Sequence, residues 1–264
     1  MPKLNRPGAT IHWEERGSGS PLLLIMGTRM SSRMWYPILP LLAQHHRVIS
    51  FDNRGSGDSS PSEDFTISDL VDDALAVLDA AGVEKAHVYG VSLGGGLALE
   101  MGMSHPERVT SLILGCVGPK TEVTPEHKRS SLIWTLIPTW LKIRLTAKAF
   151  YGSECDPDAR AIDLRTLRED PYDPATVARQ GRATGAYSTT LAEVAAVSAP
   201  TLVLHGDEDK AVPVEGGRKL AELIPGARLI VYPGAGHNYL VGRGQTTAEH
   251  VLDFLAEVDQ GNRS

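Results

Sequence analysis

Short apolar runs alternate with longer helical patterns along most of this 264-residue chain. Several runs, such as Pro21–Met26, are continuously apolar, which is typical of strands covered on both faces. Between the runs, apolar residues recur with helical spacing, as at Leu70, Ala74 and Leu78. This alternation predicts an α/β fold, with a doubly wound and mostly parallel sheet of about eight strands. The expected strands are Ala9–Glu15, Pro21–Met26, Arg47–Phe51, Ala86–Val91, Val109–Cys116, Thr201–His205 and Arg228–Tyr232.

The alternation stops between Gly118 and Ala199, where helical patterns are divided by several prolines and no strand pattern is evident. The piece 132–145 is unusually apolar and aromatic, and it contains Trp134 and Trp140. Open α/β sheets bind ligands beyond the carboxyl ends of their strands. We therefore expect residues 119–198 to form an inserted helical cap over a core domain made of 1–118 and 199–264. The alternative is one more packed helical layer.

Composition and charge narrow the class of protein. Apolar residues make up 42% and charged residues 22%, as in ordinary globular proteins, and the formal net charge is −6. A nucleic-acid surface needs clustered Lys and Arg, and the sequence has no basic run. No apolar run is long enough to span a bilayer, and the N-terminus has no signal-peptide pattern. With only two cysteines, the chain is expected to be cytoplasmic and to bind neither nucleic acid nor membrane.

A Gly-x-Ser-x-Gly pattern, Gly90 to Gly94, follows the expected strand Ala86–Val91 and precedes a helical run. Glycines on both sides permit a sharp strand-to-helix turn that forces Ser92 outward. At a helix N-terminus, free backbone N–H groups favour developing negative charge. The sequence therefore predicts that Ser92 is a nucleophile. The alternative is a glycine-rich turn with an ordinary serine.

A serine nucleophile needs a base within hydrogen-bond reach and a group that orients the base. His237 lies in a glycine-rich loop after the last expected strand, where catalytic residues often sit. His205 is the main competitor, but it ends a strand and is expected to be structural. The predicted base is His237.

Three acids, Asp207, Glu208 and Asp209, compete for the orienting role in the loop after the next-to-last strand. Here the chain resembles the α/β-hydrolase family, in which serine, acid and histidine follow in that order. In that family a Gly-x-x-Asp pattern followed by Val-Pro marks the acid, and residues 206–213 match it. The resemblance implies Asp209 as the acid, with Asp207 as the runner-up and a solvated acidic turn as the alternative.

An oxyanion hole needs backbone N–H donors aimed at the tetrahedral intermediate. Leu93, which directly follows Ser92, is expected to supply one. In the resembling family the second donor comes from a His-Gly-x loop after an early strand. Met26-Gly27-Thr28 matches it, with Met in place of the common His, and Thr28 is the implied donor.

The sequence contains no recognisable cofactor-binding motif. The loop after Phe51 lacks the Gly-x-x-x-x-Gly-Lys pattern of phosphate-binding loops, and its Arg54 is expected to shape a turn. No dinucleotide fingerprint and no Cys or His spacing typical of metal ligands occurs. We expect no cofactor and no metal.

The resemblance extends from about Ile11 to Leu255 and is greatest to small microbial esterases, 3-oxoadipate enol-lactonase-like hydrolases and cofactor-free haloperoxidases. It implies hydrolysis of a carboxylic ester or lactone through an acyl-enzyme, with a small apolar substrate as partner. Perhydrolysis or C–C cleavage by the same triad, and a non-catalytic ligand sensor, are the alternatives. Expected substrate-binding residues are Gly27, Arg29, Trp134 and Trp140. Arg29 and Arg33 could meet a substrate carboxylate, and the favoured alternative is that both are solvated surface arginines. The sequence makes no prediction of oligomeric state.

Overall fold

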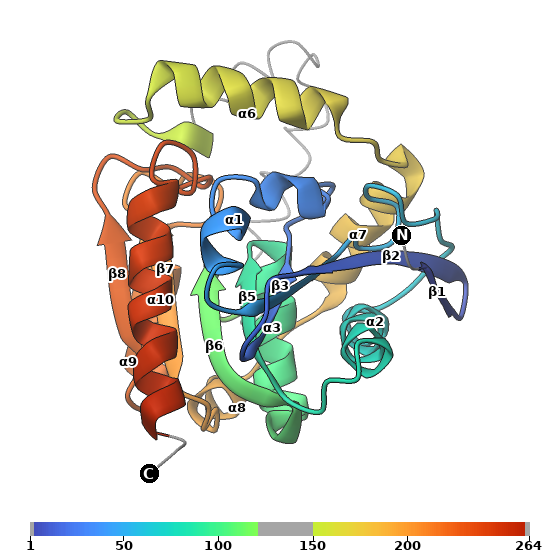
Figure 1. The fold of residues 1–264 in the computed structure, drawn as a ribbon, viewed down its shortest axis with the longest axis horizontal. Helices are drawn as coiled ribbons and strands as arrows, with labels where there is room; N and C mark the ends of the chain where they lie inside the picture. Colours follow the sequence, from blue (N-terminus) through green and yellow to red (C-terminus); the bar gives the residue numbers. More distant parts are fainter. Residues whose placement is uncertain (1–2, 121–149, 262–264) are drawn as a thin grey trace.

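The computed structural model describes residues 3–120 and 150–261, and its centre is an eight-stranded sheet (Figure 1). The strand order is β1-β2-β4-β3-β5-β6-β7-β8. The first two strands pair antiparallel with each other and β2 pairs antiparallel with β4, whereas every later pair is parallel. The strands are β1 (Lys3–Arg6), β2 (Ala9–Arg16), β3 (Pro21–Ile25), β4 (Arg47–Phe51), β5 (Ala86–Val91), β6 (Val109–Gly115), β7 (Thr201–Gly206) and β8 (Arg228–Tyr232).

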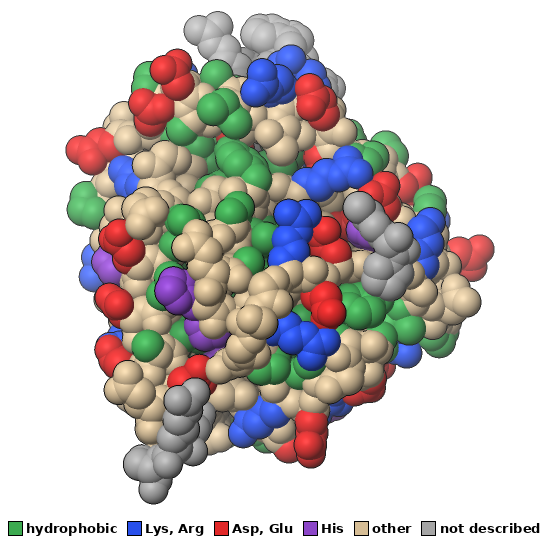
Figure 2. Space-filling view, in the orientation of Figure 1, with side chains coloured by type: hydrophobic (Ala, Val, Ile, Leu, Met, Phe, Trp, Pro, Cys, Tyr) green, Lys and Arg blue, Asp and Glu red, His purple; other side chains and the backbone are tan. Residues whose placement is uncertain are grey.

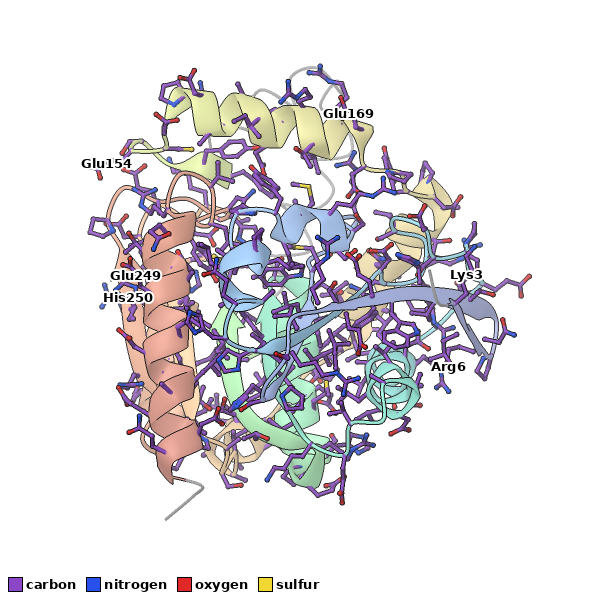
Figure 3. All side chains as sticks on the ribbon, viewed as in Figure 1. Lys3, Arg6, Glu154, Glu169, Glu249 and His250 are labelled. Atoms are coloured by element: carbon purple, nitrogen blue, oxygen red, sulfur yellow. The ribbon has the colours of Figure 1, made fainter. Side chains whose placement is uncertain are left out.

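This topology confirms the predicted α/β fold, and all seven predicted runs are strands. The additional strand, β1, is short and has the partly exposed sequence KLNR, so it carries no apolar signal. Its Lys3 and Arg6 lie at one edge of the molecule, far from Glu249 and His250 on the C-terminal helix (Figure 3).

Helices cover both faces of the sheet because its central strands are apolar on both sides. Along β3, Leu23 and Ile25 belong to one hydrophobic cluster, and Leu22 and Leu24 belong to the other. The first cluster includes residues of α2 (Ile67–Ala80), α3 (Leu93–Ser104), α8 (Leu191–Ala195) and α9 (Val214–Leu223). The second includes residues of η1 (Ser32–Trp35), α1 (Leu39–Leu42) and α10 (Gly244–Gly261). The short helix η2 (Pro106–Arg108) leads into β6.

The loop after β4 is held by a buried ion pair, in keeping with the structural role predicted for Arg54. Its Nε lies 2.6 Å from Oδ2 of Asp73 on α2, and both side chains are almost fully buried. The helix itself begins with a capping box in which Thr66 and Asp69 bond each other's backbone N–H groups. These interactions fix the loop that runs beside the carboxyl end of β3.

Between β6 and β7 the described chain is helical, with α6 (Pro157–Glu169), α7 (Pro174–Ala186) and then α8. Figure 1 shows α6 lying across the end of the molecule toward which the arrow of β8 points. The far end of this segment packs on the core, since Val194 belongs to the first hydrophobic cluster. The boundaries of a separate cap at 119–198 stay a prediction, and Trp134 and Trp140 lie outside the described residues.

Among residues 3–120 and 150–261, no helix has both the length and the hydropathy that crossing a bilayer requires. On the face drawn in Figure 2, acidic and basic side chains are intermingled.

Candidate active site

Ser92 lies at a sharp turn between β5 and α3. Its φ of 57° and ψ of −117° place it in a backbone conformation that non-glycine residues rarely adopt. A Cβ added at Gly90 would overlap the carbonyl oxygen of Gly94, and one added at Gly94 would overlap that of Ile25. The two glycines therefore permit the close packing of strand and helix that holds Ser92 in this strained position.

Asp209 and His237 come together at the carboxyl ends of β7 and β8. The ring Nδ1 of His237 lies 2.7 Å from Oδ2 of Asp209, and both residues are buried. The other carboxylate oxygen accepts hydrogen bonds from the backbone N–H groups of Ala211 at 2.8 Å and Val212 at 2.9 Å. The carboxylate is thus fixed in orientation and presents one oxygen to the imidazole.

Electrostatics keep this carboxylate ionised. Burial by itself raises the pKa of Asp209, but polar contacts with His205 and His237, the positive charge that His237 can carry and the Val212 N–H together lower that pKa well below its ordinary value. An ionised Asp209 can stabilise an imidazolium at His237, which is what the orienting acid of a serine hydrolase must do.

The structure separates the three acids of this loop. Asp207, the runner-up, is exposed. Glu208 accepts hydrogen bonds from the backbone N–H and the hydroxyl of Ser153. Only Asp209, among these three, is placed against His237.

The predicted oxyanion loop lies directly beside Ser92. A Cβ added at Gly27 would lie 3.2 Å from the Cβ of Ser92, so any side chain at this position would crowd the nucleophile. Leu93 is the first residue of α3, where N–H groups lack an intrahelical acceptor. Thr28 and Ser92 line the same two cavities. This arrangement brings both predicted donor residues to the neighbourhood of Ser92.

Two cavities meet at Ser92. The smaller, of about 80 Å³, is lined by Ser92, His237 and Asn238 together with apolar side chains that include Met30 and Phe150. The Phe150 ring packs edge-on against the His237 ring, with centroids 5.1 Å apart.

The larger cavity has a volume of about 720 Å³, and Ser92 and Leu93 line it on one side. Its described lining is mainly apolar, with Lys120 and Glu215 as the charged members. Ser92 can therefore be approached from two compartments of different size.

The two candidate arginines are engaged elsewhere. Arg29 donates from its guanidinium to the Leu167 carbonyl at 3.0 Å and lies over the Tyr172 ring. Arg33 pairs with Asp58 at 2.9 Å, and both of these side chains are about half exposed. Neither arginine is among the described residues that line the two cavities. The substrate-binding role of Arg29 stays a prediction.

Gln180 contacts the predicted oxyanion loop, and the sequence did not predict this contact. This fully buried side chain on α7 accepts a hydrogen bond from the backbone N–H of Arg29 at 3.0 Å. Its amide nitrogen donates to the Arg54 carbonyl at 2.8 Å, which ties two loops together. Arg29 itself has a φ of 73°, so its backbone needs such support. A lone Gln in a helix gives no sequence signal for this contact.

The sequence also did not predict the contacts of two buried aspartates in the helical segment between β6 and β7. Asp163 on α6 accepts hydrogen bonds from Tyr151 at 2.7 Å, Tyr36 at 3.2 Å and the Asn238 side chain at 3.0 Å. Asp170 accepts from both the backbone N–H and the hydroxyl of Ser31. The first of these carboxylates thus anchors the residue that follows His237.

Comparisons with known proteins place the chain in a family. The profile of the Alpha/beta hydrolase family matches residues 22–250. Over 264 aligned residues, the chain is 30% identical to 2-hydroxymuconate semialdehyde hydrolase from Pseudomonas sp. (strain CF600), covering 96% of this chain and 92% of that protein.

Among solved structures, a meta-cleavage product hydrolase from Pseudomonas fluorescens IP01 is similar with a TM-score of 0.81 and 25% identity, over 97% of this chain and 98% of that one. The enol-lactonase from Burkholderia xenovorans LB400 has a TM-score of 0.84 over 97% of this chain and 100% of that one, and its 22% identity shows likeness of fold alone. The chain belongs to the α/β-hydrolase family.

Proposed function

We propose that Ser92, His237 and Asp209 form a catalytic triad that hydrolyses a carboxylic ester or lactone through an acyl-enzyme. The observation that carries this proposal is the 2.7 Å contact between Asp209 and Nδ1 of His237, in a site where His237 and Ser92 line one cavity. With Nδ1 bonded to a carboxylate, the lone pair on Nε2 is available to accept a proton.

In the proposed reaction, Nε2 of His237 takes the proton of the Ser92 hydroxyl as the oxygen attacks the substrate carbonyl. The backbone N–H groups of Leu93 and Thr28 stabilise the oxyanion. The imidazolium, held by Asp209, then gives its proton to the leaving alcohol. His237 then takes a proton from water, which attacks the carbonyl of the acyl-enzyme. The carboxylic acid is released as His237 returns the proton to the Ser92 oxygen.

The two cavities support a small and largely apolar substrate. Their described linings are mainly apolar, and burial of apolar groups would supply most of the binding free energy. The smaller space suits a short group, and the larger suits the bulkier part of the substrate. We propose that the scissile carbonyl sits where the two spaces meet at Ser92.

C–C bond hydrolysis by the same triad is the second candidate. It is favoured by the relatives, since 2-hydroxymuconate semialdehyde hydrolases are 30% and 31% identical to nearly the whole chain. In that reaction the C–C bond beside the carbonyl would break, and the departing carbanion, in place of an alkoxide, would take the proton that His237 carries. The same residues would serve, so substrate tests must decide.

The experiment compares wild type with Ser92→Ala on p-nitrophenyl esters of increasing acyl length and on 2-hydroxymuconate semialdehyde. Ser68, exposed on α2, supplies the matched control Ser68→Ala. We expect Ser92→Ala to lose at least about 10³-fold in kcat on every accepted substrate, and Ser68→Ala to match wild type. Full turnover by Ser92→Ala would exclude the proposed nucleophile.

A fluorophosphonate separates catalysis from mere ligand binding. Mass spectrometry after treatment should find one adduct, on the peptide that contains Ser92. Absence of the adduct in a folded protein would favour a non-catalytic ligand sensor on this fold.

A further inference from the structure

His205 lies next to the candidate triad but is not part of it. The residue is on β7, its side chain is fully buried, and its Nε2 lies 2.8 Å from the Val212 carbonyl oxygen. The same nitrogen lies 3.4 Å from Oδ2 of Asp209, the oxygen that His237 also contacts. One carboxylate oxygen therefore faces two histidines.

The hydrogen-bond partners fix where the His205 ring carries its hydrogen. A carbonyl oxygen can only accept, so Nε2 must be the donor to Val212. Nδ1 is buried and has no hydrogen-bond partner in the described part of the chain. A Cβ added at Gly217 on α9 would lie 2.6 Å from Nδ1, so the helix packs closely over this side of the ring. A second hydrogen on Nδ1 would be buried without an acceptor.

Val212 links His205 to Asp209 by a second route. Its carbonyl accepts from His205, and its backbone N–H donates to Oδ1 of Asp209 at 2.9 Å. His205 therefore touches one carboxylate oxygen directly and holds the residue that bonds the other. The three residues form a closed ring of polar contacts around the acid.

We propose that His205 is a positioning residue that sets the orientation and basicity of Asp209, and through Asp209 the proton affinity of His237. This proposal rests on the proposed function of Ser92, His237 and Asp209. Orientation depends on the Val212 bridge, and basicity depends on the Nε2–H that faces Oδ2. The contact with His205 also contributes to the lowered pKa of Asp209, against the effect of burial.

Cys116 is a further titratable group beside this ring of contacts. Its thiol donates to the His237 carbonyl at 3.0 Å. The Cys116 Sγ, a ring nitrogen of His205 and a carboxylate oxygen of Asp209 all lie within 4.8 Å of one another. Burial raises the pKa of the Cys116 thiol well above its ordinary value, which keeps the sulfur neutral. Cys116 therefore adds no charge to the network, and its thiol is a further side-chain hydrogen-bond partner of Asp209 beside the two histidines and the backbone donors.

The test compares two substitutions of His205. His205→Leu removes the Nε2–H and fills the space, and His205→Gln keeps an N–H at the end of a side chain of similar reach. We expect His205→Leu to lower kcat/KM about tenfold. The acidic limb of the pH profile of kcat/KM should move to higher pH in this variant, because an Asp209 that has lost one donor holds the His237 imidazolium more strongly. His205→Gln should restore most of both properties.

His87 offers a matched control, since it is also buried on a strand but bonds Ser111 and Asp259 near the start of β5. His87→Leu should lower thermal stability without moving the acidic limb. A His205→Leu profile identical to wild type would overturn the proposal. So would equal losses in His205→Leu and His205→Gln with no shift of the limb, because that result indicates a structural role only.

A readout that needs no turnover keeps this inference separate from the proposed function. In protein with ¹⁵N-labelled histidine, NMR should show His205 protonated at Nε2 and not at Nδ1. The titration of the His237 ring should move to higher pH in His205→Leu. Lack of any esterase activity or Ser92 adduct in wild type would refute the proposed function and leave this titration able to support the positioning role. An unmoved His237 titration would refute that role alone.

Discussion

Two buried aspartates lie on either side of the candidate site, and their pKa values shift in opposite directions. Asp209 lies in the loop after β7 and bonds His237. Asp163 lies on α6 and bonds Asn238, the residue that follows His237. The exposed fractions are 6% for Asp209 and 1% for Asp163. Burial alone therefore cannot explain the opposite shifts.

The donors explain the difference. Burial is the largest influence on both residues and raises each pKa. Around Asp163 the hydrogen bonds come from neutral tyrosine and asparagine side chains, and the pKa stays raised. Around Asp209 two backbone N–H groups and two histidines face the carboxylate, and one histidine can carry a positive charge, so the pKa falls. A carboxylate that must stabilise an imidazolium needs the second environment.

The comparison predicts very different effects of removing each charge. Asp209→Asn should lower kcat on an accepted ester by about 10⁴-fold, because the amide cannot stabilise the imidazolium and favours the wrong imidazole tautomer. Asp163→Asn, the matched change across the site, should lower kcat less than about tenfold. Steady-state kinetics on both variants, with folding checked by circular dichroism, test this. Equal losses in the two variants would contradict the assignment of separate roles.

Tyr151→Phe tests whether Asp163 acts chiefly as an anchor. The change removes a hydroxyl that donates to Asp163 at 2.7 Å and leaves a buried acceptor with one donor fewer. We expect a loss of about 1 to 3 kcal/mol in the free energy of unfolding, measured by urea denaturation. The exposed Tyr172 provides the control Tyr172→Phe, for which stability should be unchanged. An unaltered free energy of unfolding in Tyr151→Phe would contradict the anchoring role of Asp163.

The opposite pKa shifts predict opposite dependences of stability on pH. Asp209 has a lowered pKa in the folded protein, so its contribution is present above the ordinary value of 3.8 and is lost as the pH falls toward the folded pKa. Asp163 has a raised pKa, so its contribution is present below 3.8 and is lost as the pH rises through the folded pKa.

Urea unfolding of wild type, Asp209→Asn and Asp163→Asn between pH 3 and pH 7 measures both contributions. The stability of Asp209→Asn relative to wild type should fall as the pH rises through the acidic end of this range. That of Asp163→Asn relative to wild type should increase. Parallel curves for the two variants would show that the environments do not differ as described.

The smallest effect is expected at Asp207, two residues before Asp209. Its side chain is exposed, so Asp207→Asn should leave kcat/KM within about twofold of wild type. A loss comparable to that of Asp209→Asn would reinstate Asp207 as the orienting acid.

The sequence by itself determined the alternation of strands and helices and the turn at Ser92. These features are local, since strand periodicity and the glycines at 90 and 94 are visible within a few residues. The family resemblance selected Asp209 from three acids, and the structure places that residue against His237. The strand β1 was missed because four partly exposed residues carry no apolar pattern.

Only the tertiary structure decided which side chains hold the site together. Gln180 contacts Arg29 across 151 positions of sequence, and Asp163 contacts Asn238 across 75. His205 looked like an ordinary strand residue, and its relation to Asp209 depends on how the loop through Val212 folds back. Such contacts leave no periodic pattern in the sequence, because the residues around one partner do not depend on the presence of the other. The candidate catalytic residues are therefore readable from local motifs, and the residues that contact them from a distance follow only from the packing of distant segments.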